Sequence, residues 1–198
     1  MNNFIYITII LIICYFFYKY IYDGTEYVTS SIDNRAYKVR SKNDKQRKAD
    51  LLAILYDKLN LIVNALNNDP TYYYNEDIQR LIYNWEKGVS IKEIGNLEND
   101  AAYVINKKHM SICLENYDSI EYYNLMTYVG IHELAHIMSL EIGHGPEFIK
   151  NFQFLLNYSK QLIYINPYTA QEEPLYIELS KLNTADNYCG VKIENSLN

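Results

Sequence analysis

Cysteine is scarce in this sequence. The chain has three cysteines among 198 residues, and Cys14, Cys113 and Cys189 lie far apart. They form no Cys-x-x-Cys pair and no disulfide framework, so a cysteine-based zinc ribbon and a disulfide-rich scaffold are both excluded. Unpaired cysteines also favour a reducing compartment. No internal repeat is present.

The sequence also lacks an excess of positive charge, with a net charge of −6 at pH 7. Its basic residues are concentrated between positions 35 and 48, which leaves the rest of the chain strongly acidic. An acidic domain is a poor partner for phosphates, so direct tight binding to nucleic acid is not expected. The basic stretch is interpreted as a solvated linker, and the alternative is a contact with anionic lipid headgroups.

The amino terminus has no basic residue before its apolar segment and no small-x-small cleavage site after it. This favours a retained membrane anchor over a cleaved signal peptide. Residues 4–22 are just long enough to cross a bilayer, with Lys19 close enough to the end to reach the interface. The nearby basic residues all follow this segment, so the positive-inside rule predicts a single-pass protein with a cytosolic catalytic domain.

Histidine is rare as well, yet three of the four histidines lie in one short stretch. His132-Glu133-Leu134-Ala135-His136 has the His-Glu-x-x-His pattern. On a helix, residues i and i+4 project from nearly the same side, so His132 and His136 are predicted to bind one metal ion. Glu133 is predicted to act as general base by accepting a proton from water that the metal activates.

His144 is the candidate for the third ligand, because a catalytic zinc usually has three protein ligands and one open position. Glu141 and Glu147 are the alternatives. Glu141 would face away from His132 on a regular helix, and Glu147 suits the first turn of the next helix. His109 lies on an expected strand and is interpreted as a structural or exposed residue.

The context of the motif favours a helix over residues 119–141. Asp118 and Glu121 resemble a capping box at its start, and Gly143 and Pro146 are typical of a helix end and a new helix start. The apolar residues opposite the histidines would anchor this helix in a core. They are Tyr123, Met126, Gly130, Leu134, Ile137 and Met138.

The His-Glu-Leu-x-His helix, followed by His144-Gly145-Pro146-x-Phe148, resembles the SprT-like and WLM-type minimal zinc metallopeptidases. The resemblance implies a small zincin-like domain with Zn²⁺ held by His132, His136 and His144, and with Glu133 as general base. It covers about residues 98–165, and no SprT-type zinc ribbon follows. Tyr188-Cys189-Gly190 and the apolar amino terminus are similar to short membrane-anchored proteins of this type from large DNA viruses.

The fold class expected is α+β: a mostly helical zincin-like domain with a short sheet, preceded by one transmembrane helix. The segments are an anchor at 1–22, a basic polar linker at 23–43 and the metallopeptidase domain at 44–198. Apolar spacing and stop signals place the other elements. These are helices at 44–67, 76–87 and 146–165, a turn at 90–95, strands at 103–105 and 110–114, and a wrapping tail from 166.

The function expected is a membrane-anchored zinc endopeptidase that acts on a protein or peptide substrate. The strand at 110–114 is the candidate edge strand for pairing with an extended peptide. Tyr188 is a candidate for stabilising the oxyanion, although the sequence does not choose among many tyrosines. The alternative is a catalytically silent, zinc-stabilised membrane adaptor or assembly protein. A purely structural zinc site would have no need of Glu133 and would usually add cysteines.

Overall fold

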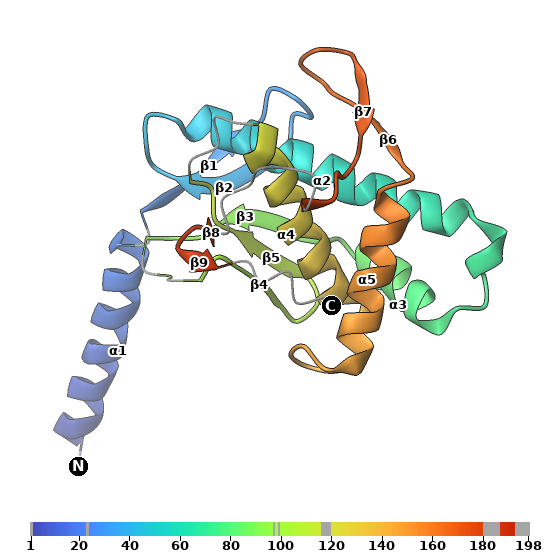
Figure 1. Cartoon of the computed structure of the whole chain (residues 1–198). Coiled ribbons are helices and arrows are strands. Elements are labelled where there is room, and N and C mark those ends of the chain that lie inside the picture. Colours follow the sequence, from blue (N-terminus) through green and yellow to red (C-terminus); the bar gives the residue numbers. More distant parts are fainter. Residues whose placement is uncertain are drawn as a thin grey trace.

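The computed structural model describes residues 2–22, 24–96, 98, 100–115, 120–179 and 187–192, and these form an α+β fold (Figure 1). The helices are α1 (Asn2–Tyr22), α2 (Lys45–Asn68), η1 (Pro70–Tyr72), α3 (Glu76–Glu86), α4 (Ile120–Met138) and α5 (Pro146–Ser159). The strands are β1 (Thr25–Thr29), β2 (Ala36–Arg40), β3 (Ser90–Glu93), β4 (Ala102–Ile105), β5 (His109–Ile112), β6 (Ile163–Ile165), β7 (Glu172–Pro174), β8 (Asn187–Tyr188) and β9 (Val191–Lys192).

The helices α2 and α3 confirm the predictions for 44–67 and 76–87. The apolar residues of α2 recur every three or four positions, which predicts one buried face. They all lie in the hydrophobic core: Leu51, Leu55, Leu59, Ile62, Val63 and Leu66. In α3, the side chain of Asn75 accepts a hydrogen bond from the Ile78 N–H and caps the helix. Glu76 and Asp77 follow in the first turn, where negative charges interact favourably with the helix dipole and stabilise the helix.

The central sheet has three strands in the order β3-β5-β4. β5 pairs parallel with β3 and antiparallel with β4, so it is the middle strand. Two predictions are therefore wrong. The turn expected at 90–95 contains the strand β3, and the strand expected at 110–114 is central rather than at the edge. The edge that adjoins α4 belongs to β4.

The helix α4 lies at the centre of the domain, where it packs against α2, α3, α5 and the sheet (Figure 1). Its contact with α2 is close at Gly130. A Cβ atom at that position would lie 2.7 Å from Cδ1 of Leu55, which is itself completely buried. Glycine therefore allows the two helices to approach and fixes the depth of α4 in the core. The predicted capping pair, Asp118 and Glu121, lies outside the residues whose side chains are described.

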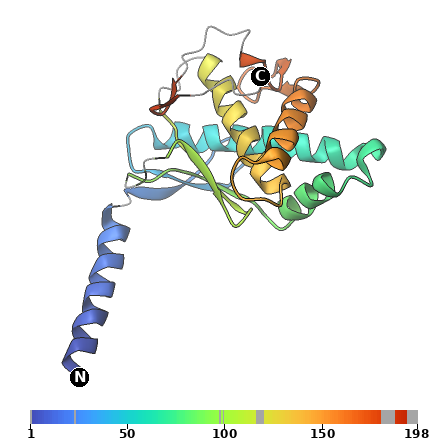
Figure 2. The same ribbon diagram turned by 60° about the horizontal axis from the view of Figure 1, so that its bottom comes forward.

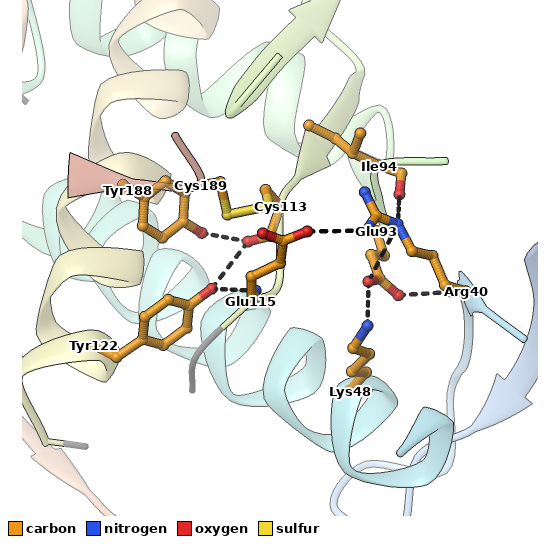
Figure 3. Close-up of a disulfide and its surroundings, with 9 residues drawn as sticks. All are labelled: Arg40, Lys48, Glu93, Ile94, Cys113, Glu115, Tyr122, Tyr188 and Cys189. Carbon is orange, nitrogen blue, oxygen red and sulfur yellow. Dashed lines mark hydrogen bonds and ion pairs between the residues drawn. A yellow bond between two sulfur atoms is a disulfide. The ribbon is translucent and has the colours of Figure 1, made fainter. Parts of the chain in front are cut away.

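The stretch interpreted as a polar linker, 23–43, includes the antiparallel hairpin of β1 and β2. Two basic residues of the stretch at 35–48, Arg40 and Lys48, enter the core instead of solvent (Figure 3). The fully buried carboxylate of Glu93 accepts hydrogen bonds from the backbone N–H of Arg40 and from Nζ of Lys48. The Arg40 guanidinium also donates to the carbonyl of Ile94 and pairs with Glu115. This ion cluster joins the hairpin and α2 to the central sheet.

The helix α1 extends away from the rest of the molecule (Figures 1 and 2). Among the described residues, no helix combines the length and the apolarity needed to span a bilayer. The predicted transmembrane helix and the predicted single-pass membrane localisation are therefore wrong. The uninterrupted apolar run covers residues 4–18, which is shorter than the about 20 residues of a typical spanning helix. Extending the count to Tyr22 includes the charge of Lys19.

The tail beyond α5 wraps back over α4. The helix ends at Ser159 rather than at 165, and the chain continues into the β6–β7 hairpin. Further along, the backbone N–H and C=O of Ile177 both hydrogen-bond to the side chain of Asn124 in α4. The expectation of a wrapping tail agrees with these contacts.

A disulfide between Cys113 and Cys189 joins the tail to the end of β5 (Figure 3). The prediction that the cysteines form no disulfide is wrong, because folding brings together two residues that are 76 positions apart in the sequence. Tyr122 and Tyr188 stack beside the bond, and both hydroxyls donate to the carbonyl of Cys113. The cysteine pattern therefore no longer favours a reducing compartment.

Replacing Cys189 with Ser is expected to lower the free energy of unfolding by about 3 to 5 kcal/mol, because the cross-link closes a long loop in the unfolded chain. Urea unfolding of the two proteins measures the difference. The matched control is Cys14→Ser, since Cys14 is exposed and unpaired. Equal midpoints of urea unfolding for wild type, Cys189→Ser and Cys14→Ser would contradict the presence of the disulfide.

Candidate metal centre

The histidines of the His-Glu-x-x-His motif lie in the last two turns of α4, half-buried and on the side that faces α5. The helix ends at Met138, three residues before the predicted end. The chain then reverses through a loop, Gly143 takes the left-handed conformation with φ of 88°, and Pro146 begins α5. This reversal carries His144 back toward the helix, as the sequence predicts.

The three imidazoles point their Nε2 atoms at one position. Nε2 of His144 lies 3.0 Å from Nε2 of His132 and 3.2 Å from Nε2 of His136. Nitrogen ligands about 2.0–2.1 Å from a tetrahedral zinc ion are about 3.3 Å apart, so these separations fit a single ion. One His144 nitrogen cannot donate a proton to both neighbours. Shared coordination of a cation therefore accounts for the cluster better than hydrogen bonding does.

The two alternative ligands, Glu141 and Glu147, have structural roles in the loop. The carboxylate of Glu147 accepts hydrogen bonds from the backbone N–H groups of Leu140 and Glu141. The carboxylate of Glu141 accepts one from the N–H of Phe148 in the first turn of α5. A Cβ atom at Gly145 would lie 2.5 Å from the Glu141 carboxylate, so a larger residue there would have to displace this side chain. These contacts fix the loop and leave His144 as the third nitrogen donor.

Two phenylalanines of α5 support the imidazole rings. Phe148 contacts all three, with its ring centroid 4.3 Å from that of His136, 4.7 Å from His144 and 4.8 Å from His132. Phe152 also contacts the group, with its ring centroid 5.1 Å from that of His132. Phe148 is the aromatic residue of the His-Gly-Pro-x-Phe pattern, so its position in the sequence has a direct packing explanation.

Two of the histidines, His132 and His136, are held in the neutral form that a metal requires. Burial and the neighbouring His136 and His144 lower the pKa of His132 to about 3. Burial, with a smaller contribution from His144, lowers the pKa of His136 to about 4. Neutral imidazoles keep their nitrogen lone pairs available for coordination at ordinary pH.

Glu133 is the most buried acid of the site, with 2% of its surface exposed. Burial raises the pKa of its carboxyl group to about 8. Among the described residues, its Oε2 atom has no hydrogen-bond partner. A buried carboxylate oxygen without a partner is costly to maintain, and such groups are found at functional sites. The structure therefore places a buried carboxylate oxygen without a hydrogen-bond partner in the residue next to His132, a candidate metal ligand.

Three side chains that the sequence analysis did not single out bind the carboxyl end of α4. Asn84 donates to the carbonyl of Ile137, and Arg80 donates to the carbonyl of Met138. The ammonium of Lys107, in the turn between β4 and β5, donates to the carbonyls of His136 and Ser139. Cations at the carboxyl end of a helix interact favourably with the helix dipole. The three side chains also fix the end of α4 from which His136 projects. Their distance in sequence from the motif explains why they were missed.

Other candidate residues lie outside the centre. His109 is exposed on β5 and its ring pairs with Ser90. The hydroxyl of Tyr188 is bound to the carbonyl of Cys113, so the structure does not support its role at the oxyanion. The other group of metal-type side chains among the described residues is Cys113, Glu115 and Cys189. Both sulfur atoms of that group are already joined in the disulfide.

Comparison with known proteins shows similarity to proteins of large DNA viruses. An uncharacterized protein of Acanthamoeba polyphaga mimivirus is 26% identical over 207 aligned positions, which cover all of this chain and 99% of the relative. An uncharacterized protein of Invertebrate iridescent virus 3 is 36% identical over 73 positions, covering 36% of this chain and 46% of the relative. One of Invertebrate iridescent virus 6 is 32% identical over 74 positions, covering 35% of this chain and 42% of the relative. No family model and no solved structure matches.

Glu141→Ala is expected to weaken zinc binding by about 10- to 100-fold, the usual cost of losing a residue that orients a metal ligand. The substitution removes the acceptor of the Phe148 N–H and frees the loop that carries His144. Competition with a chromophoric chelator measures the affinity. Glu178→Ala is the control, since Glu178 pairs with Lys160 away from the site. Unchanged affinity in Glu141→Ala would contradict the role of the loop.

The metal-free protein is expected to lose stability on both sides of neutral pH. The Glu133 pKa of about 8 lies above its ordinary value of 4.5, so the stability that it contributes is lost as pH rises from about 5 to 8. The pKa values of His132 and His136 lie below 6.5, so their contribution is lost as pH falls below 6.5. Urea unfolding in a chelator at pH 5, 6.5 and 8 tests both directions. Glu133→Gln removes only the loss above pH 5, and parallel profiles for the two proteins would contradict the assignment.

Proposed function

We propose that this protein is a zinc-dependent endopeptidase. The observation that supports the proposal most strongly is the convergence of three imidazole nitrogens at one position, two of them on the helix that also carries the buried acid Glu133. A structural zinc site has no use for an unpartnered acid, whereas hydrolysis of a peptide bond needs a proton acceptor there. The side chains of His132, His136 and His144 hold the ion in this proposal.

The zinc ion supplies Lewis acidity, which makes water more acidic and polarises a carbonyl group. Glu133 accepts the proton of the attacking water at its carboxylate and delivers it to the amine that leaves. Burial raises the pKa of this carboxyl group, which favours holding the transferred proton until it is delivered to the amine. Phe148 and Phe152 hold the imidazoles in place and exclude water from that side of the centre.

The edge of β4 is the proposed binding place for the substrate backbone. β4 is the outer strand of the central sheet and packs against α4, so an extended peptide that pairs with it would run past the metal-bearing helix. Strand addition of this kind supplies main-chain hydrogen bonds without regard to sequence. This assignment replaces the strand at 110–114, whose two neighbours already occupy its edges.

The resemblance to SprT-like and WLM-type metallopeptidases supports the same chemistry. It depends on the His-Glu-Leu-x-His helix and on His144-Gly145-Pro146-x-Phe148. In the proposal the histidines of both patterns bind zinc, and Phe148 packs against their rings. The alternative is a catalytically silent, zinc-stabilised adaptor. An adaptor would bind zinc through the same histidines but would have no requirement for Glu133.

Glu133→Gln is the decisive variant. It keeps the shape of the side chain and removes its capacity to accept a proton, so cleavage of an unfolded protein should fall by at least about 100-fold. Bound zinc, measured by elemental analysis, should stay near one ion per chain. Product formation is followed by mass spectrometry for wild type, the variant and chelated wild type.

The outcomes separate the two functions. Zinc binding without cleavage by the wild type would favour the adaptor. Cleavage that survives in Glu133→Gln would overturn the catalytic role of Glu133. Loss of both zinc and activity in His144→Ala, with zinc retained in His109→Ala, would agree with the assigned ligands.

A further inference from the structure

The loop between the ligands His136 and His144 is held unusually firmly. Glu147 binds two consecutive N–H groups of the loop, and Glu141 binds the N–H of Phe148 beyond it. Lys107 binds the carbonyl of Ser139, at the other end. Such a loop presents its side chains in fixed positions, and a preorganised surface loses little freedom when a ligand binds.

Two aliphatic side chains of this fixed loop point into solvent. Leu140 is 68% exposed and Ile142 is fully exposed. One exposed aliphatic residue needs no special explanation, but two within three positions of a rigid loop beside a metal ligand form a local apolar surface. We call Leu140 and Ile142 the apolar rim.

The charged groups around this loop are used within the fold. Arg80 binds the carbonyl of Met138 and the carboxylate of Glu147. Lys107 binds carbonyls at the end of α4, and Glu141 binds the backbone of α5. The surface that the loop offers to a neighbouring ligand is therefore dominated by aliphatic carbon.

The apolar rim lies within reach of a substrate at the metal centre. Ile142 is two residues from His144, so their Cα atoms are at most about 7.6 Å apart. An extended peptide advances about 3.3 Å per residue, so this distance corresponds to about two residues on either side of the reacting carbonyl. A substrate side chain close to the cleaved bond can therefore contact the apolar rim.

We propose that Leu140 and Ile142 determine substrate specificity by selecting peptides with a large apolar side chain within two residues of the cleaved bond. The inference rests on the proposed peptidase function and adds its substrate preference. Pairing along β4 does not discriminate between side chains, so selection requires a side-chain contact of this kind. The favoured substrates are unfolded or extended segments, because folded proteins bury such residues.

The test uses the full chain loaded with zinc. Its substrates are pairs of peptides, and the two peptides of a pair differ only by Leu or Asn at one of the four positions nearest the cleaved bond, two before it and two after it. The wild type should cleave the preferred Leu peptide at least about 10-fold more efficiently in kcat/KM than its Asn partner. Ile142→Asn should reduce this ratio severalfold, because the kcat/KM for the Leu peptide falls toward that for the Asn peptide. Ile142→Ala gives a second variant at the same position.

The control is Ile165→Asn, at an exposed aliphatic residue of β6, beyond the opposite end of α5 (Figure 1). A second readout is independent of turnover: fluorescence anisotropy of labelled Leu and Asn peptides with Glu133→Gln, and with Glu133→Gln carrying Ile142→Asn. The Leu peptide should lose affinity only in the double variant. Equal Leu-to-Asn ratios of kcat/KM in wild type, Ile142→Asn and Ile165→Asn would overturn the role of the apolar rim in specificity. If zinc-loaded wild type cleaved no peptide at all, the proposed function itself would be overturned.

Discussion

The attachment of the carboxyl end of α4 is the constraint on which the metal centre depends. The last carbonyls of a helix lack partners within it, and here Asn84, Arg80 and Lys107 supply them from α3 and from the β4–β5 turn. The same turn ends the edge strand β4. One lysine therefore links the helix that carries the histidines to the strand proposed to bind substrate. While this contact holds, α4 and β4 cannot shift independently of each other.

The other end of α4 is held by the tail. Tyr122 in its first turns stacks on the completely buried Tyr188, and the disulfide fixes the adjoining residue Cys189 to the end of β5. Burial raises the pKa of Tyr188, and the neighbouring Tyr122 and the negative charge of Glu133 add to this shift. Attachment at both ends leaves α4 little freedom to rotate, which keeps Glu133 buried instead of solvated.

Local patterns predicted the parts of the structure that local forces determine. The spacing of Leu51, Leu55 and Leu59 predicted α2. The His-Glu-x-x-His motif predicted the helix of His132 and His136, and the turn after it predicted the return of His144. Long-range contacts were not predictable in this way. Ser90–Glu93 contains one apolar residue and forms a strand only because β5 pairs with it, so the edge strand was assigned wrongly. The disulfide joins cysteines 76 positions apart, and no sequence pattern indicates that partnership.

The basic stretch at 35–48 shows how folding changes the meaning of charge. Arg40 and Lys48 are buried against Glu93, while Arg35 pairs with Asp33 and Lys45 with Glu26. Burial of the cluster is tolerated because the carboxylate of Glu93 receives two hydrogen bonds, which offset part of the cost of removing charges from water. At least four of the seven cations are therefore engaged by acids of the same domain. The buried Arg40 and Lys48 therefore have a structural role in the fold.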